Sequence, residues 1–144
     1  MTCDDEVSYD ADRLPSRDET RTLYDSVGWA AYTDDLDALI RGLENSAVVV
    51  TARSGGKLIG LARIVSDHAT IAYLQDVLVH PSFRRRGIAT ALINRAFAPF
   101  NRVRQHVLLT DAEPGQRAFY ESIGFTEIRD LPGQGCRSFV RFIP

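Results

Sequence analysis

The chain of 144 residues has few cysteines, no long apolar run and no excess of either charge. Its two cysteines, Cys3 and Cys136, stand near opposite ends, which leaves a single bridge open but predicts a reducing, cytoplasmic setting. No apolar run approaches the roughly 20 residues of a membrane span, and the acidic start from Met1 to Asp12 is unlike a signal peptide. A net charge of −2 argues against a protein that coats nucleic acid.

The histidines are also few, and they lack the spacing of metal ligands. His68, His80 and His106 are far apart, and no cysteine or carboxylate completes a ligand set with them. We therefore expect no metal site. His80 precedes Pro81 and is expected to be structural or close to a bound ligand, whereas His68 lies in a Ser-Asp-His turn that could face a substrate.

The composition that remains is that of an ordinary globular protein, with 44% hydrophobic and 25% charged residues. The length suits one domain with a full core, so we expect a single domain over residues 1–144. Residues 1–14 are expected to be a flexible terminus or to hold a short strand near Val7–Tyr9. No internal repeat or low-complexity linker divides the chain.

Hydrophobic periodicity and turn residues predict the remaining elements. Ser16 and Glu19 have the spacing of a capping box, which predicts a helix that ends before Gly28. Trp29–Tyr32 is expected to be an aromatic loop, and Thr33 can cap a second helix. The predicted ranges are helices at residues 17–27, 34–43, 87–98 and 114–123, and strands at residues 47–53, 58–65, 70–79, 107–109, 125–128 and 138–143.

The stretch Gln75–Ile93 carries the most information about function. An apolar strand pattern, Val77–Val79, leads through His80-Pro81 into the arginines Arg84–Arg86 and then through Gly87 into a helical pattern. A basic turn between a strand and a helix presents backbone N–H groups that suit an anion such as a phosphate. Glycine lets the main chain approach the anion because it has no Cβ. Three arginines alone would favour a solvated basic turn or a nucleic-acid patch over an anion cradle.

The same residues carry a family resemblance. Arg84-x-x-Gly87-x-Ala89 after the strand is similar to the acetyl-CoA signature of the GNAT superfamily of N-acetyltransferases, and Ala118–Phe125 is similar to its second motif. The resemblance runs from about Leu23 to the C-terminus. It implies the α+β GNAT fold, a mixed, mainly antiparallel central sheet flanked by helices. Four segments most resemble bacterial relatives of the plant serotonin (arylalkylamine) N-acetyltransferases: Val27–Trp29, Leu43–Ser46, Ser66–Ala69 and Asp76–Val79.

The resemblance implies that acetyl-CoA is the cosubstrate, with its diphosphate on the basic turn and its pantetheine arm paired with the preceding strand. The residues expected to bind it are Val77, Leu78, Val79, Arg84, Arg85, Arg86, Gly87, Ile88, Ala89 and Thr90. Enzymes of this family splay two strands at this point, so Val107–Leu109 should part from Val77–Val79. Glu113 stands where relatives often carry an asparagine that contacts the cofactor, which puts contacts from this segment in doubt.

Tyr120 matches the family tyrosine that stands near the CoA sulfur, where a phenol can protonate the departing thiolate. Its neighbour Phe119 is the better core residue, although packing of Tyr120 is the alternative. No cysteine lies near the motif to carry the acetyl group, so attack by the amine is expected to be direct.

The general base is left open between Asp76 and Gln75. Asp76 is the only carboxylate of its strand, but it could equally make a structural hydrogen bond, and Gln75 can only hold a water. Strict alternation places Tyr73, Gln75, Val77 and Val79 on one face and Leu74, Asp76 and Leu78 on the other. It favours Gln75 for the cofactor face unless the strand bulges.

The predicted acceptor is a small primary amine of the arylalkyl type. The residues expected to line its pocket are Trp29, Tyr32 and Tyr73, with core packing as the alternative for Trp29. The rivals are a transferase for a protein N-terminus or lysine, and a non-catalytic acyl-CoA-binding sensor. We expect no nucleic-acid or membrane partner. The acceptor's identity and the oligomeric state stay open, a homodimer included.

Overall fold

The computed structural model describes residues 6–144, so Cys3 lies outside the described part of the chain. The chain divides into two compact units, one ending at Leu109 and the other comprising Thr110–Pro144. The first unit holds a five-stranded sheet in the order β1-β2-β3-β4-β5. Its strands are β1 (Val7–Asp10), β2 (Val48–Ser54), β3 (Lys57–Ser66), β4 (Ile71–Val79) and β5 (Gln105–Leu108).

The sheet is mixed and mainly antiparallel. Neighbouring strands run antiparallel from β1 to β4, and only β4 and β5 are parallel. The antiparallel β2–β3 pair is a hairpin that turns at Gly55-Gly56, both with positive φ. These observations confirm the α+β fold class and the short first strand expected near Val7.

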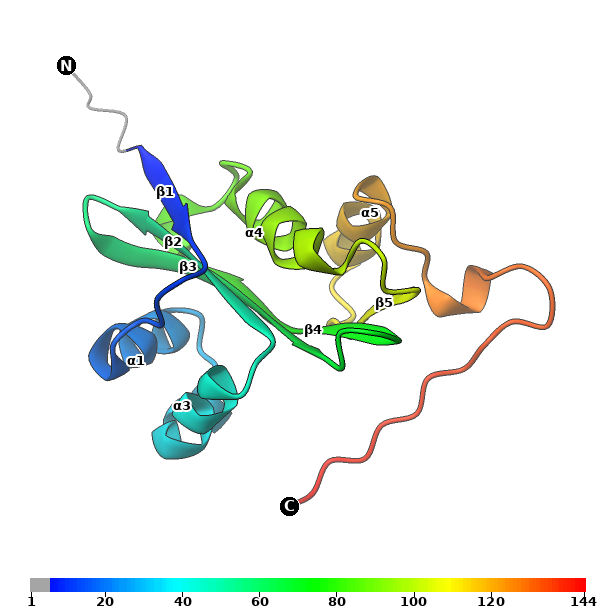
Figure 1. The fold of residues 1–144 in the computed structure, drawn as a ribbon, viewed down its shortest axis with the longest axis horizontal. Coiled ribbons are helices and arrows are strands. Elements are labelled where there is room, and N and C mark those ends of the chain that lie inside the picture. Colours follow the sequence, from blue (N-terminus) through cyan, green and yellow to red (C-terminus); the bar gives the residue numbers. More distant parts are fainter. Residues whose placement is uncertain (1–5) are drawn as a thin grey trace. The chain divides into compact units, whose positions relative to one another are not determined.

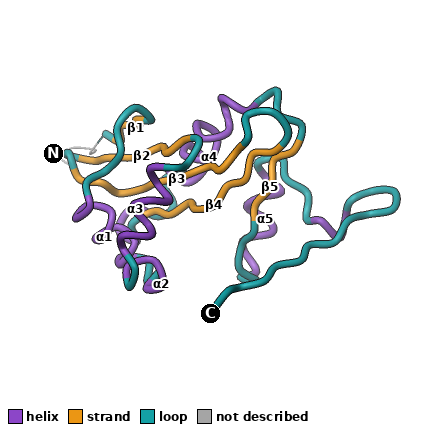
Figure 2. Tube along the Cα trace, turned by 60° about the horizontal axis from the view of Figure 1, so that its bottom comes forward, coloured by secondary structure: helices purple, strands orange, loops and turns teal. Residues whose placement is uncertain are grey.

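Helices cover both faces of the sheet (Figures 1 and 2). In both views α1 (Arg17–Ser26), α2 (Ala30–Thr33) and α3 (Leu36–Glu44) lie on one face, and α4 (Ile88–Phe97) lies on the other. The α4 helix packs closely because β3 carries a glycine beneath it: a Cβ placed on Gly60 would lie 3.0 Å from a methyl carbon of Leu92. A larger residue at this position would push α4 off the sheet.

The core on the α1–α3 face is built from leucines at helical spacing and from strand residues that point the same way. Full burial of each such side chain is worth about 1.5–3 kcal/mol. Its buried members are Leu23, Tyr24, Leu36, Leu39, Leu43, Val49, Leu58, Leu61 and Leu78. Val27, Trp29, Tyr32 and Ile40 pack against this cluster and are only partly buried. Two tyrosines therefore belong to one packed layer, Tyr24 inside it and Tyr32 at its margin.

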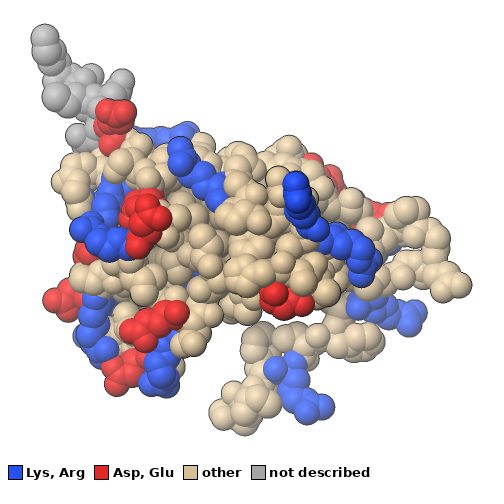
Figure 3. Space-filling view, viewed as in Figure 1, with Lys and Arg blue, Asp and Glu red and all other residues tan. Residues whose placement is uncertain are grey.

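Charged groups of both signs are mixed on the molecular surface. On the face drawn in Figure 3, basic and acidic side chains lie side by side over the region of α1 and α3. One exposed ion pair there joins the two helices, with Arg17 2.6 Å from Asp37. No helix within residues 6–144 is both long and apolar enough to cross a membrane.

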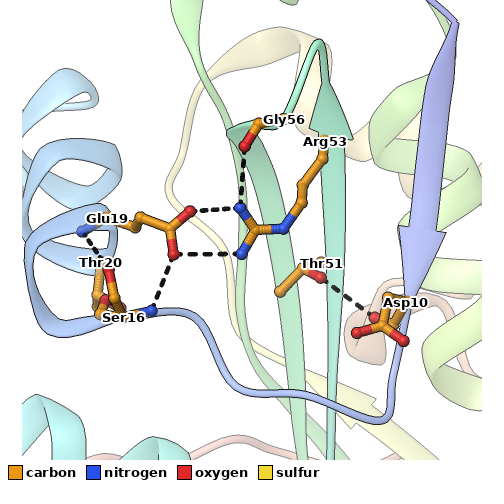
Figure 4. Close-up of polar contacts among 7 residues, drawn as sticks. All are labelled: Asp10, Ser16, Glu19, Thr20, Thr51, Arg53 and Gly56. Atoms are coloured by element: carbon orange, nitrogen blue, oxygen red, sulfur yellow. Dashed lines mark hydrogen bonds and ion pairs between the residues drawn. The ribbon is translucent and has the colours of Figure 1, made fainter.

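The N-terminus of α1 has the predicted capping box, and the box is tied to the sheet (Figure 4). The Glu19 amide donates to Ser16 Oγ (3.2 Å), and the Ser16 amide donates to Glu19 Oε1 (3.0 Å). The same carboxylate forms an ion pair with Arg53 of β2, which also donates to the Gly56 carbonyl (3.2 Å). The hydrogen bond from Arg53 is the main reason that the pKa of Glu19 falls to about 2.

Two expectations for the segment between α1 and α3 are wrong. Trp29–Tyr32, expected as a loop, mostly belongs to the short helix α2. The α3 helix begins later than expected, because Asp35 rather than Thr33 is its N-cap and accepts a hydrogen bond from the Ala38 amide (3.2 Å). Asp is the stronger N-cap residue, which explains the shift.

The second unit contains α5 (Pro114–Ser122) and a short 3-10 helix, η3 (Ile128–Asp130). The strands predicted at residues 125–128 and 138–143 are wrong, since neither range is strand here. Ile128 begins η3 instead, next to ion pairs of Arg117 with Glu127 (2.6 Å) and Asp130. Phe139 is 90% exposed, so the apolar residues of the last segment lack the packing that a strand face needs.

Candidate functional site

The loop between β4 and α4 has the geometry of an anion cradle. It opens with a 3-10 turn, Pro81–Phe83, where His80 Nδ1 accepts a hydrogen bond from the Ser82 amide (3.1 Å). Arg85 and Gly87 then adopt positive φ values of 64° and 75°. Residues in this left-handed region turn successive N–H groups toward one concave side. Of the three histidines considered in the sequence analysis, His80 is thus the one whose side chain stabilises the turn of this loop.

The loop leads into a helix N-terminus that no side chain caps. Gly87 is the N-cap of α4 and makes no side-chain cap hydrogen bond, and the first helical bond runs from the Ala91 amide to its carbonyl (3.1 Å). The amides of Ile88, Ala89 and Thr90 precede that bond, at the positive end of the helix dipole. A Cβ built on Gly87 meets nothing within 4 Å, so the space before the helix is open.

The three arginines of the predicted basic turn come directly before this helix N-terminus in the chain. Arg84, Arg85 and Arg86 are all exposed, and the Arg86 guanidinium lies 5.2 Å from the centre of the Phe83 ring. Ile88 is 3% exposed and packs into the core, so it can offer a ligand only its main-chain amide. The arrangement suits a polyanion that meets backbone amides at its centre and guanidinium groups around it.

Beside the loop, β4 has an unpaired edge. The parallel pairing of β4 with β5 begins at Ile71–Gln105 and ends at Leu74–Leu108. From Asp76 to Val79 the strand pairs with β3 alone among the described strands. Val107 and Leu108 pair with Tyr73 and Leu74, so the pairing of β4 with β5 ends before Val77–Val79 is reached. Backbone groups of Val77–Val79 on the free edge can pair with an extended ligand, as in strand addition.

A β-bulge lies at the start of this free edge. Arg63 of β3 lies opposite Asp76, but the next residue, Ile64, lies opposite Leu74, so Gln75 has no partner on β3. Opposed residues of an antiparallel pair share a face of the sheet. Asp76 and Leu74 therefore lie on opposite faces, and the strict alternation predicted along this strand is wrong at Gln75.

The bulge gathers polar side chains on the α1–α3 face. Tyr73 lies opposite Val65, so it faces the same side as Asp76, and burial followed by the Asp76 charge raises its pKa. Gln75 is exposed and its Nε2 donates to the hydroxyl of Tyr32 (3.1 Å). The structure thus brings together Tyr32, Tyr73, Gln75 and Asp76, four of the residues singled out from the sequence.

Asp76 is 4% exposed, and both of its carboxylate oxygens are engaged. Oδ2 accepts from Arg63 Nε (2.5 Å) and from the Tyr24 hydroxyl (3.0 Å), while Oδ1 accepts from the Tyr32 hydroxyl (2.7 Å). Burial alone would lower the pKa of Arg63, but the charge and hydrogen bond of Asp76 outweigh it and raise that pKa. The carboxylate is therefore a hub that orients two phenols and a guanidinium.

Arg63 and Tyr24 were not anticipated from the sequence. Arg63 interrupts the apolar run of β3, and a lone charge in such a run is a signal for a buried partner. Its guanidinium also reaches Ser46 Oγ (3.4 Å) and packs close to α3, since a Cβ on Gly42 would lie 3.2 Å from Arg63 Nη1. Tyr24 gave no such signal, because a tyrosine beside Leu23 on a helix reads as core.

Aromatic rings border the exposed side of this network. The ring centres of Trp29 and Tyr32 lie 6.1 Å apart, and both rings pack against Tyr24, at 5.8 and 5.2 Å. Trp29 and Tyr32 are each half-buried, so their remaining surface is available to a ligand. Packing and pocket lining, the two readings of Trp29, are thus both compatible with its position.

Tyr120 lies on α5, in the second unit. Its ring contacts those of Phe119 (4.9 Å between centres) and Phe125 (6.0 Å), and both Phe119 and Tyr120 are half-buried. Burial, followed by the charge of Asp111, raises the pKa of Tyr120, so the phenol keeps its proton at neutral pH. Glu113 is the N-cap of α5 and makes no side-chain cap hydrogen bond.

The other candidates have structural surroundings. His106 Nε2 lies 2.9 Å from the Phe100 carbonyl, and its ring stacks on Phe97 at 4.6 Å. His68 has φ of 64° and its ring centre is 5.6 Å from that of Phe100. Within residues 6–144 no group of three or more His, Cys, Asp or Glu side chains could hold a metal ion. Cys136 is an exposed free thiol.

An open helix N-terminus after a glycine turn, next to an unpaired strand edge in an α+β fold, is the arrangement that the GNAT resemblance implies. Residues 44–127 match the family described as the acetyltransferase (GNAT) domain. The chain belongs to this family.

The curated relatives that the chain matches are longer proteins. An uncharacterized N-acetyltransferase, ycf52, of Pyropia yezoensis is 30% identical over 119 residues, which cover 80% of this chain and 66% of the relative. The histone acetyltransferase TAP1 of Glycine max is 32% identical over 120 residues, covering 74% of this chain and 50% of the relative. The chain thus spans between half and two thirds of these proteins.

Solved structures agree with the fold. A GNAT-family acetyltransferase from Streptococcus pneumoniae TIGR4 superimposes with a TM-score of 0.80 at 27% identity, covering 95% of this chain and all of that one. The aminoglycoside N-acetyltransferase AAC(6')-Iy in complex with CoA has a TM-score of 0.73 at 20% identity, covering 99% and 98% of the two chains. The second likeness concerns the fold alone.

Proposed function

We propose that this chain is an acetyl-CoA-dependent N-acetyltransferase that transfers acetyl directly to a small primary amine. The observation that carries the proposal is the cradle at Gly87 beside the free edge of β4. A turn with positive φ, an uncapped helix and an unpaired strand edge together suit a ligand with a diphosphate and an amide-bearing arm. Family membership supports the same reading.

The residues present fit acetyl-CoA. The amides from Arg85 to Thr90 would hold the diphosphate, with the Arg84–Arg86 side chains adding charge, and the main chain of Val77–Val79 would pair with the pantetheine arm. Bound acetyl-CoA supplies the thioester, whose carbonyl carbon forms a C–N bond with the amine as its C–S bond breaks. This side of the site therefore acts through backbone amides and arginine charge, with Ile88 contributing only its amide.

We assign the general acid to Tyr120. Its raised pKa keeps the phenol protonated at neutral pH, so it can give a proton to the departing sulfur, and solvent then returns one. For the base we favour a water held by Gln75, which takes the proton that the amine loses. Asp76 is the weaker candidate because Tyr24, Tyr32 and Arg63 already occupy its two oxygens.

For the acceptor we favour an arylalkylamine. The half-buried rings of Trp29, Tyr32 and Tyr73 lie near the exposed Gln75, and aromatic faces attract both an aryl group and an ammonium. The resemblance to relatives of the plant serotonin N-acetyltransferases points the same way. A protein amine is the second candidate, because the soybean relative is named as a histone acetyltransferase. We also propose a cytoplasmic location. A chloroplast is the alternative, because a relative in Arabidopsis thaliana is named chloroplastic.

Acetyl-CoA binding is tested first, through thermal unfolding of the wild-type chain. Acetyl-CoA should raise the melting temperature because it binds the native state. Gly87→Glu should abolish the rise, since a carboxylate would stand where phosphate binds. Gly133→Glu is the matched control, because Gly133 also has positive φ (80°) and open space around its Cα, but is no part of the loop. An equal rise in both variants would place the cofactor elsewhere.

Catalysis is tested by release of the CoA thiol with a panel of acceptors: tryptamine, polyamines, amino acids, a lysine peptide and a peptide with a free N-terminus. Fastest release with tryptamine is expected. Preference for either peptide would favour the second candidate. Cofactor binding without release from any acceptor would favour a non-catalytic acyl-CoA sensor.

A further inference from the structure

The hydroxyl of Tyr32 lies at the centre of three polar contacts. It is 2.7 Å from Asp76 Oδ1, 3.1 Å from Gln75 Nε2 and 3.4 Å from an Arg63 guanidinium nitrogen. A phenol has one proton to donate, and the carboxylate of this Asp76–Arg63 ion pair can only accept. The proton of Tyr32 is therefore directed to Asp76, at the shortest of the three distances.

This commitment settles which end of the Gln75 amide meets Tyr32. The phenol oxygen has only lone pairs left, so its second neighbour must be a donor. Of the two ends of a glutamine amide, only the NH₂ group donates. Nε2 therefore points to Tyr32 and Oε1 points the other way. Because Gln75 is the exposed residue of the bulge, that oxygen is accessible to a bound molecule.

We propose that Tyr32 is a positioning residue that holds the Gln75 amide with its acceptor oxygen, Oε1, turned toward the nucleophile of the transfer reaction. The proposal rests on the acetyl transfer proposed above and makes its acceptor site specific for N–H donors. Arg63 and Asp76 fix the phenol, the phenol fixes the amide, and the amide presents a single lone-pair-bearing group to the acceptor.

The chemistry of the nucleophile follows from this arrangement. A neutral primary amine can donate one N–H to Oε1 and still direct its lone pair at the thioester carbonyl. A water at Oε1 can take the proton that the amine loses when the C–N bond forms. A tertiary amine has no N–H to donate after losing its proton, and should inhibit poorly if at all. A disordered amide would instead offer its NH₂ group for part of the time and repel the same N–H.

The positioning is tested by NMR on the ¹⁵N-labelled full chain, with no substrate present. The two side-chain NH₂ signals of Gln75 are identified by their loss in Gln75→Leu. In the wild type they should show nuclear Overhauser contacts to the Tyr32 ring and chemical shifts away from those of free glutamine. Tyr32→Phe keeps the ring and should return them to free-glutamine positions. Tyr24→Phe removes the other phenol on Asp76 and should leave them unchanged.

The effect on the reaction is tested by a double-mutant cycle on kcat/KM for tryptamine. Tyr32→Phe should lower it roughly tenfold in the wild-type background and less than about twofold in the Gln75→Leu background, since the two residues act as one unit. A purely structural role of Tyr32 would give the same loss in both. Tyr24→Phe should lower thermal stability without such coupling to Gln75.

The outcomes separate this inference from the proposed function. Free-glutamine signals in the wild type, or signals that Tyr32→Phe does not move, would overturn the positioning. The wild-type measurement needs no change at Tyr32, so the inference can fail even if Tyr32→Phe does not fold. If no amine is acetylated while the NMR contacts are present, the proposed function fails and the positioning of Gln75 stands. Equal losses of kcat/KM in both backgrounds would show that Tyr32 does not act on the reaction through Gln75.

Discussion

Tyr32 and Tyr120 are both half-buried phenols whose pKa values are raised, first of all by burial, but their surroundings differ. Tyr32 donates to a buried carboxylate at 2.7 Å and accepts from Gln75. Tyr120 packs between Phe119 and Phe125, and its hydroxyl is hydrogen-bonded with the side chain of Thr110. One phenol proton is committed to an ion pair, whereas the other faces no carboxylate at hydrogen-bond distance among the contacts described.

The difference teaches that a raised pKa alone does not make a tyrosine an acid catalyst. A phenol that is held by a carboxylate orients its neighbours and contributes to stability. A phenol whose proton is uncommitted can give it to a leaving group. We therefore propose a positioning role for Tyr32 and an acid role for Tyr120, and the following changes test that assignment.

The largest effect is expected from Arg63→Met, which removes the guanidinium that pairs with Asp76, the carboxylate to which Tyr32 donates. Asp76 would remain buried with only Tyr24 and Tyr32 as donors. Loss of one partner of a buried ion pair costs about 3–5 kcal/mol in the free energy of unfolding, measured by urea denaturation. A loss below about 1 kcal/mol, the range of exposed pairs, would mean that the two phenols satisfy Asp76 without Arg63.

The next effect is expected on catalysis from Tyr120→Phe. Removing the uncommitted proton should lower kcat by about 100-fold or more, with little change in the KM for acetyl-CoA. In the wild type, kcat should fall on the basic side only above pH 10, because the raised pKa keeps the phenol protonated up to that point. A decrease of less than about threefold would show that Tyr120 packs only, and that water protonates the thiolate.

A smaller effect is expected from Asp76→Asn. The asparagine amide keeps the shape of the carboxylate, but it has no negative charge with which to accept hydrogen bonds from Tyr32 and Arg63. The free energy of unfolding should therefore fall by about 1–3 kcal/mol. The shape of the pH–rate profile should stay intact if Asp76 only orients Tyr32. Flattening of the acidic limb in a folded variant would instead make Asp76 the base and would overturn the water-assisted mechanism.

The smallest effect is expected from Arg53→Met, the control at the sheet margin. The Arg53–Glu19 side chains are 15% and 34% exposed, and such pairs are worth about 0–1 kcal/mol at neutral pH. The pKa of Glu19 is lowered from 4.5 to about 2, so its contribution is present above pH 4.5 and is lost as pH falls toward 2. The variant should show a shallower loss of stability over this range. An unchanged slope would assign the acid limb to other carboxylates.

Much of the fold could be predicted, because the signals are local. Ser16 and Glu19 predict the capping box, Gly55-Gly56 predicts the hairpin, and Gly87 predicts the turn before α4. The strands predicted at residues 125–128 and 138–143 are wrong. A strand needs a neighbouring strand to pair with, and the alternation of apolar residues does not show whether one lies beside it. In place of the first of these strands, Glu127 and Asp130 form ion pairs with Arg117, which is distant in sequence, and the segment forms a 3-10 turn.

The site divides in the same way. The sequence by itself determined the anion cradle, because backbone amides before a helix follow from a strand, a glycine turn and a helix in succession. Only the tertiary structure decided the contacts around Asp76. The bulge at Gln75 shifts the register by one residue and turns Tyr73 to the face of Asp76, which strict alternation placed on the opposite side. Arg63 and Tyr24 join that carboxylate from 13 and 52 residues away, and contacts of such range depend on packing, which no local pattern encodes.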